Sequence, residues 1–580
     1  MSELYPLTDA NATQNLLRGL KHCNRLENTP RTRFEVLDLF RPVVRDLIET
    51  VAQRYTGQSL PMAPREQSNY RNVITLLQEM AFGYKIVVSE SAGSAIPGTG
   101  KIRHHAIVLA LDYLNELALR HLQVYEDIPD DVWQDCNTLY RLADEQKIHQ
   151  KPIGREISTA NDLKSPEHLF AALHVLYLSG SHSLRRGKIV QLQAFIAEHI
   201  DDIAITLVDE KPKPDTISYG INLDCAAPAA TLRFFGAKES ASVRALHLEQ
   251  FMQILASQTS KTPKAVSALY ESDVLTREIL HRLNKSLSCD RHERLYSREF
   301  CHEKMDFLHG LKEIYAIFRY AEQPIDSHTP SAGEPELTIE SSGDTPKTNL
   351  ETDFITHPGF NDKTSGNTLW DAVAHRNVAS SQQKALGRLP TDATLGAMND
   401  RGEWVLLNRS EGGLGLVWLG DTSPHITVGE LVASRKLGDD SAEDDWITGV
   451  VTWMRVDENA HLRCGIAHIA RVVEPVLVER TRGSHNSITT QTECLMATTL
   501  DEASRPCIFV PAYMFHTGES INIRRGHSVA HYKLVDKIDS TGSFSLFSVE
   551  SSGASLTEDG LAQQELQEYG IYPDKQGTGD

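Results

Sequence analysis

The sequence predicts a multidomain protein in which a mainly α-helical N-terminal domain with a small β insertion precedes a C-terminal antiparallel β-barrel and a β-rich extension. The chain has 580 residues, which is too many for one ordinary hydrophobic core. Apolar residues recur every three or four positions in the first half, and at alternate positions beyond about Trp370. A stretch with almost no large apolar residues separates these two patterns.

Residues 1–321 are expected to form the helical domain. From Phe34 to Val51, apolar residues at spacings of three and four make a stripe along one helix face. Similar patterns occupy 72–88, 104–122, 167–180, 190–200 and 291–320. Three shorter segments rich in β-branched or aromatic residues predict the β insertion, at 203–208, 219–225 and 231–236.

The second half is expected to hold four further parts. Residues 322–369 are rich in Pro, Ser, Thr and acids, and they predict a flexible linker because they cannot bury enough apolar surface to offset their ordering entropy. Residues 370–480 predict a small barrel, with strands at 404–410, 413–420, 430–435, 446–456 and 463–473. A β-rich extension follows at 481–557, and residues 558–580 form a polar tail.

The charge and cysteine content limit the classes of partner. The formal net charge is -20, so the chain as a whole repels nucleic-acid polymers and anionic lipid, and any phosphate must bind in a local basic pocket. No apolar run reaches the ~20 residues that span a bilayer, so no membrane insertion is expected. The eight cysteines lack the spacing of a disulfide framework, and no signal peptide precedes the first helix pattern. These features predict a cytoplasmic protein.

Two short motifs stand at the start of the β-rich half. Asn408, Ser410 and Gly413 form N-x-S-x-x-G between two strand patterns. Lys384 and Arg388 form K-x-x-x-R, and Arg388 lies 20 residues before Asn408 (408 minus 388). A planar guanidinium can bind two adjacent acceptors or a phosphate, short polar side chains can complete such a site, and glycine permits a close backbone approach.

These motifs resemble the signature of the PilZ domain family of cyclic di-GMP receptors. That signature is R-x-x-x-R in a loop before the first strand, followed by [D/N]-x-S-x-x-G between later strands. The resemblance extends through residues 449–473, and the segment after Arg480 is similar to the extension of some atypical members. It implies a PilZ-like barrel that needs no cofactor and takes cyclic di-GMP as its ligand. The ligand-binding residues that it implies are Lys384, Arg388, Asn408, Ser410 and Gly413.

One position departs from the family pattern. Lys384 stands where the family has arginine, and an ammonium group cannot bind a guanine edge through two parallel hydrogen bonds. Arg376 and Arg409 are the candidates for a replacement arginine. Four tryptophans, Trp404, Trp418, Trp446 and Trp453, fall in strand patterns and are expected in the barrel core, although one of them could lie near the ligand.

Three functions compete. The first is a cyclic di-GMP receptor that acts through a protein partner of its helical domain, in motility, type IV pili, surface attachment or biofilm-related processes as the resemblance implies. The second is a PilZ-like docking adaptor that has lost the nucleotide. The third is an enzyme, but the sequence has no nucleophile elbow or H-E-x-x-H motif. Cys289, His292, Cys301 and His302 match no zinc-finger spacing, so neither a metal site nor a catalytic residue is expected.

Overall fold

The computed structural model of the 580-residue chain describes two compact units. The first comprises Met1–Phe307, Arg401–Ala470 and Thr541–Ser543, and the second comprises Leu308–Asp400, Arg471–Ser540 and Phe544–Asp580. The residues described are 10–92, 96–153, 165–208, 219–232, 235, 241–260, 279–280, 282–284, 286–287, 297–321, 403–420, 422–436, 446–480, 491–500, 504–525, 528–552 and 556–557.

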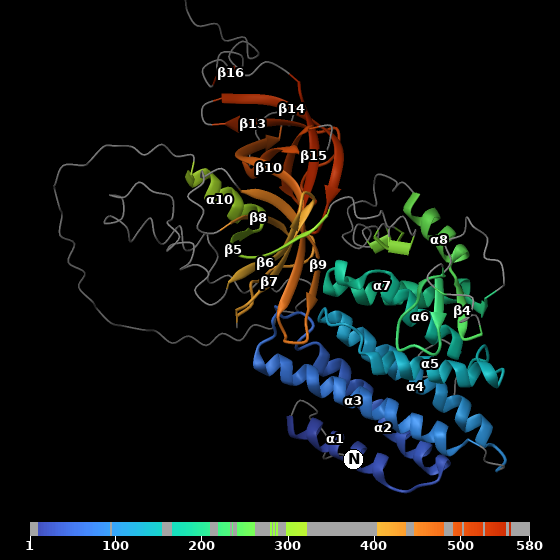
Figure 1. Ribbon diagram of the computed structural model, residues 1–580. Helices are drawn as coiled ribbons and strands as arrows, with labels where there is room; N and C mark the ends of the chain where they lie inside the picture. Colours follow the sequence, from blue (N-terminus) through green and yellow to red (C-terminus); the bar gives the residue numbers. More distant parts are fainter. Residues whose placement is uncertain are drawn as a thin grey trace, which may run out of the picture. The chain divides into compact units, whose positions relative to one another are not determined.

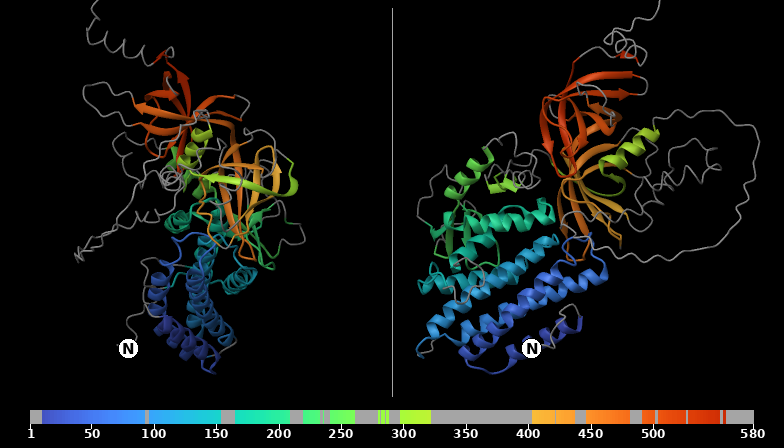
Figure 2. Two further views of the ribbon diagram at one scale, coloured as in Figure 1. Left: turned by 90° about the vertical axis from the view of Figure 1, so that its left-hand side faces the viewer. Right: turned by 180° about the vertical axis from the view of Figure 1, so that it is seen from behind.

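Helices build the N-terminal part of the first unit, as the sequence predicts. Those described are α1 (Ala10–Arg25), α2 (Pro30–Ala52), α3 (Pro64–Glu90), α4 (Thr99–Gln123), α5 (Asp130–Glu145), α6 (Pro166–Leu178), α7 (Arg186–Glu198) and α8 (Glu249–Ser260), with short 3-10 turns η2 (Ser181–Ser183) and η3 (Ile200–Asp202). The blue helices α1 to α4 lie side by side in Figure 1 and in the right-hand view of Figure 2. None of the described helices is long and apolar enough to span a membrane.

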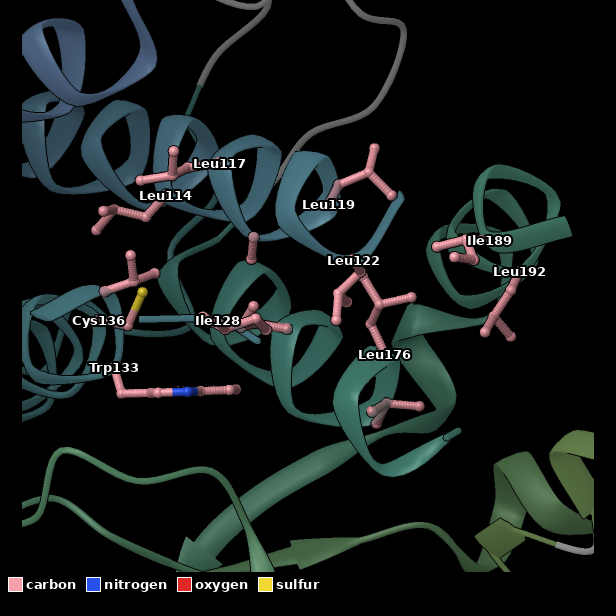
Figure 3. Close-up of a cluster of buried hydrophobic side chains, with 14 of the residues drawn as sticks. Leu114, Leu117, Leu119, Leu122, Ile128, Trp133, Cys136, Leu176, Ile189 and Leu192 are labelled. Carbon is pink, nitrogen blue, oxygen red and sulfur yellow. The ribbon is translucent and has the colours of Figure 1, made fainter. Parts of the chain in front are cut away.

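Helix α4 is the centre of this helical part. It is buried over nearly its whole length from His105 to Gln123, because helices α2, α3, α5, α6 and α7 all pack against it. Figure 3 shows leucines of α4 facing Trp133 and Cys136 of α5, Leu176 of α6 and Ile189 of α7. This explains why its sequence is apolar on more than one face, since a helix surrounded by others has no solvent side.

The predicted β insertion is a four-stranded sheet. Its order is β1-β4-β2-β3, and all pairs are antiparallel. The strands are β1 (Ala204–Leu207), β2 (Tyr219–Asn222), β3 (Ala230–Thr231) and β4 (Val243–His247). Strands β1 and β2 lie where the sequence places them, β3 overlaps the segment predicted at 231–236 only at Thr231, and β4 is an addition.

His174 of α6 joins this sheet to the helices and should make stability depend on pH. Its ring is fully buried, stacks on Trp133 and accepts a hydrogen bond from the Ala229 backbone N–H at 3.0 Å. Burial lowers the pKa of His174 from 6.5 to about 3. Below its ordinary pKa the unfolded chain therefore takes up a proton that the folded chain does not, so stability falls as the pH falls.

We expect His174 to contribute a loss of about 1 kcal/mol in the free energy of unfolding between pH ~7 and pH ~5.5. Urea denaturation of the full chain, followed by helical circular dichroism at both pH values, measures this loss. The variant His174→Gln keeps a side-chain acceptor but does not titrate, so its loss should be smaller by that amount. An equal loss in both proteins would contradict the assignment.

A closed six-stranded antiparallel barrel forms the rest of the first unit. Within the described residues the strands pair in the order β10-β7-β6-β5-β8-β9, and β9 pairs again with β10 to close the ring. They are β5 (Glu299–His309), β6 (Trp404–Ser410), β7 (Gly413–Trp418), β8 (Leu431–Lys436), β9 (Ile447–Val456) and the first half of β10 (Leu462–Arg480). Closure leaves no sheet edge exposed.

The helix predicted for residues 291–320 is wrong over 299–309, which form β5 and pair with β6. The yellow-green strand β5 runs among the orange strands in Figure 1. Cys301, Met305 and Phe307 alternate as a strand requires, and Gly310 then takes a φ of 83° before helix α10 (Leu311–Ala321) begins. The barrel therefore takes one strand from the segment before the predicted linker. Residues 322–402 lie outside the described residues, so the linker's limits stay a prediction.

The predicted β-rich extension is a second closed barrel, in the second unit. Its described strands pair in the order β11-β12-β15-β14-β13-β10, and β11 pairs again with β10. They are β11 (Thr492–Thr499), β12 (Pro506–Pro511), β13 (Ser520–Arg525), β14 (Ser528–Ser540) and β15 (Phe544–Ser551), with β16 (Leu556–Thr557) paired to β14. This barrel has its own core, in which Val478, Ile508 and Phe547 are buried.

Candidate functional site

The hairpin of β6 and β7 carries the N-x-S-x-x-G residues. Ser410 ends β6, Gly413 starts β7, and the two are paired across the hairpin. The Ser410 hydroxyl donates to the carbonyl oxygen of Gly413 at 3.2 Å. Asn408 pairs with Gly415, and its amide makes no hydrogen bond within the described part of the chain. In this hairpin the Ser410 hydroxyl is therefore hydrogen-bonded within the protein, whereas the Asn408 amide can hydrogen-bond a ligand.

Gly413 is required by the barrel itself. A Cβ atom at this position would lie 2.1 Å from the backbone oxygen of Ile466 in β10. Strands β7 and β10 pair at this point, with Gly413 opposite Ala467. Since a backbone oxygen in a ladder cannot move aside, the glycine of the motif allows the two strands to meet.

A row of residues crosses the outer face of the barrel beside this hairpin. The cross-strand pairs are Trp453 with Gly465, Gly465 with Gly415, and Gly415 with Asn408. We refer to these four residues as the glycine row. Paired residues share a face, and their chain neighbours Met454, Cys464 and Leu416 are buried in the core, so the row faces outward.

The two glycines of the row let planar groups lie over the sheet. A Cβ on Gly465 would lie 1.9 Å from Nε1 of Trp453, so the indole covers this glycine. A Cβ on Gly415 would lie 2.9 Å from both Nδ2 and Oδ1 of Asn408, so the amide covers that one. The indole N–H has no hydrogen-bond partner among the described residues. Because these two glycines are cross-strand partners, the indole and the amide cover neighbouring positions of the outer face, where another planar group can stack.

Two arginines continue this face beyond Trp453. Arg455 lies two residues further along β9, and it pairs across the strands with Arg463 of β10. Arg455 is bonded to the carboxylate of Asp127, which follows α4, and Arg463 donates to Asp457 at 2.9 Å. Burial alone would raise the pKa of Asp127, but hydrogen bonds from His182 and Arg455 hold it below its ordinary value.

A cavity of about 1130 Å³ opens at these arginines, within the first unit. Its walls include Trp453, Arg455 and Arg463 of the barrel, and Arg71 and His182 of the helical part. Its size is slightly above the ~300–1,000 Å³ usual for small-molecule sites. The cavity can therefore admit a ligand as large as a cyclic dinucleotide.

The remaining predicted residues fall in two groups. Arg409 is exposed at the other side of the hairpin, where its Nε donates to Glu299 at 2.9 Å. That ion pair holds the pKa of Arg409 above its ordinary value. An exposed pair of this kind adds little stability, so Arg409 remains free to rearrange. Lys384, Arg388 and Arg376 lie outside the described residues, and their roles stay predictions.

The tryptophans differ in their positions. Trp404 and Trp418 lie in the core as expected, whereas Trp446 stacks with Arg435 and Trp453 lies on the outer face.

The sequence analysis did not single out Arg455 or Arg463 as ligand-binding residues. The sequence does contain W-x-R in β9 and R-x-G in β10. Alternate residues of a strand share a face and arginine side chains are mostly exposed, so these two patterns indicate a tryptophan and two arginines on the outer face of the barrel. Cys301 and His302 are neighbours in β5, at a β-bulge where the pairing with β6 shifts register.

Comparisons with known proteins identify the family. One family model, the N-terminal domain of "Cyclic-di-GMP receptor FimW", matches residues 1–212. A second, its "middle PilZ domain", matches residues 221–475 and so includes both motifs, β5 and the glycine row. The chain belongs to this family of PilZ-containing cyclic-di-GMP receptors. Its members are receptors and not enzymes, which confirms that part of the prediction from sequence, as it does the PilZ-like barrel.

The comparison with curated proteins agrees along nearly the whole chain. The cyclic-di-GMP receptor FimW of Pseudomonas aeruginosa is 22% identical over 553 residues, which cover 93% of this chain and 87% of the relative. No solved structure matches the chain. The similarity therefore includes the helical part as well as the barrel, and both parts are features of the family.

Proposed function

We propose that this protein binds cyclic di-GMP on the outer face of its first barrel. The observation that carries the proposal is the hairpin presenting Asn408, Ser410 and Gly413 beside the glycine row, in a chain of this receptor family. Lys384 and Arg388 supply the cations that wrap the nucleotide, and Asn408 and Ser410 bind from beneath it. Arg409 can join them once it leaves Glu299.

The nucleotide signal passes to a protein partner through the helical part. The relative's whole-chain similarity supports this, because a barrel alone would suffice to bind the nucleotide. The processes in question are motility, type IV pili, surface attachment or biofilm formation. The protein acts in the cytoplasm, which the free thiols of the seven described cysteines support.

A docking adaptor without nucleotide is the second candidate, and one observation favours it. Lys384 replaces the first arginine of the signature, and Arg409, a candidate replacement, is paired with Glu299. A docking adaptor does not require the basic pair Lys384 and Arg388, but the presence of the pair is compatible with one.

Calorimetric titration of the full chain with cyclic di-GMP separates the two candidates. A receptor should give saturable binding that GMP and cyclic di-AMP do not reproduce at the same concentrations. Absence of binding by a folded protein, at concentrations well above those of a cellular messenger, would overturn the receptor function and leave the adaptor.

A further inference from the structure

We infer that Trp453 and Arg455 form a second half of the nucleotide site, and that Asp127 of the helical part competes with the nucleotide for Arg455. This inference rests on the proposed function, and it assigns to β9 an aromatic contact and a second arginine contact, neither of which the two sequence motifs supply. It also names the helical residue through which the site is regulated.

Trp453 is placed to stack a guanine. Its indole covers Gly465, and the Asn408 amide covers Gly415, the cross-strand partner of Gly465. Other tryptophans of the barrel, Trp404 and Trp418, pack on each other in the core at a centroid distance of 5.3 Å. Stacking on an aromatic face is a recurrent way to hold a base, and the adjacent amide can hydrogen-bond the edge of that base.

Arg455 supplies the guanidinium that Lys384 does not. It follows Trp453 at the spacing that keeps both side chains on one strand face, and it is about half exposed. A guanidinium there can take a phosphate or the two acceptors of a guanine edge. Arg463 is its cross-strand neighbour, so the outer face carries two adjacent arginines at one end of the glycine row.

Both arginines are already neutralised, so an anionic ligand has to exchange with a carboxylate. Asp457 accepts hydrogen bonds from the backbone N–H groups of Asn459 and His461 as well as from Arg463, which makes it part of the β9–β10 turn. Asp127, by contrast, is not part of a barrel turn. Carboxylates also outnumber guanidinium groups in the cavity lining, so a dianion gains little there until Arg455 is released.

Asp127 connects this exchange to the helical part. The neighbouring Tyr125 accepts a hydrogen bond at its carbonyl from the Val456 N–H at 2.8 Å, which fixes the segment after α4 against the end of β9. Asp127 is also 3.3 Å from Nε2 of His182 in η2. Removing Arg455 from Asp127 therefore leaves a carboxylate with His182 as its remaining described partner, at the junction of helices and barrel.

The test is calorimetric titration of the full chain with cyclic di-GMP, using variants whose effects have opposite signs. Trp453→Ala and Arg455→Ala should each weaken binding about tenfold or more. Asp127→Asn should tighten it by about three- to tenfold, because Arg455 is then free. In the double variant of Asp127→Asn with Arg455→Ala, the gain from Asp127→Asn should disappear. Arg31→Ala, which removes an exposed arginine paired with Glu35 in α2, is the matched control and should bind as the wild type does.

Several results would overturn the inference while leaving the proposed function intact. They are wild-type affinity in folded Trp453→Ala and Arg455→Ala, weaker binding in Asp127→Asn, or an equal gain from Asp127→Asn with and without Arg455. The last result would mean that Asp127 acts by simple charge repulsion. If the wild-type chain itself does not bind, the proposed function fails instead. Circular dichroism melting of each variant shows whether it is folded.

Discussion

Replacing Arg388 with alanine is expected to weaken the binding of cyclic di-GMP by about ten- to hundredfold. A hydrogen bond between charged groups contributes ~1.5–3 kcal/mol, which corresponds to that range of affinity. Calorimetry on the full chain measures the change. Circular dichroism melting of the variant shows whether it is folded.

The partner position provides the matched variant. Lys384→Arg restores the guanidinium of the family signature. We expect it to tighten the binding of cyclic di-GMP, because a guanidinium can donate hydrogen bonds to two acceptors at once. Unchanged affinity in folded Arg388→Ala, or weaker binding in Lys384→Arg, would show that K-x-x-x-R does not face the nucleotide.

Replacing Gly413 with alanine should destabilise the first barrel by about 2 kcal/mol, within the range usual for overpacking. The added Cβ would meet the backbone oxygen of Ile466, and relief requires β7 and β10 to separate. Urea denaturation of the full chain, followed by tryptophan fluorescence, reports the loss because Trp404 and Trp418 lie in that core.

Gly465→Ala is the control for this effect. Its Cβ would meet a side chain, Trp453, which can move, so the loss of stability should be smaller than in Gly413→Ala. The displaced indole should instead weaken nucleotide binding. A Gly413→Ala protein as stable as the wild type would mean that this glycine serves the ligand and not the strand pairing.

Local patterns predicted most of the fold, because helices and hairpins depend on residues near in sequence. The stripe from Phe34 to Val51, the buried α4 and the β6–β7 hairpin are where the sequence places them. Strand β5 is not predicted by the sequence because its partner β6 follows about a hundred residues later. The spacing of apolar residues along a short segment does not indicate a pairing with so distant a strand. Gly310, with its positive φ, marked the end of β5 inside the expected helix.

The candidate site was predictable in part for the same reason. Asn408, Ser410 and Gly413 are contiguous, so their motif is visible in the sequence. The outward position of Trp453 depends on a β-bulge at Thr452, where the pairing of β9 with β10 skips a residue. Arg455 and Asp127 meet only when the helical part packs on the barrel, and no sequence spacing records that contact.

Binding of cyclic di-GMP to the outer face of the first barrel is tested most directly by hydrogen–deuterium exchange of the full chain with and without saturating ligand. The expected result is slower exchange in residues 404–418 and 449–467, which carry the hairpin and the glycine row. Saturation verified by calorimetry with unchanged exchange in both segments, or protection confined to residues 504–552 of the second barrel, would contradict it.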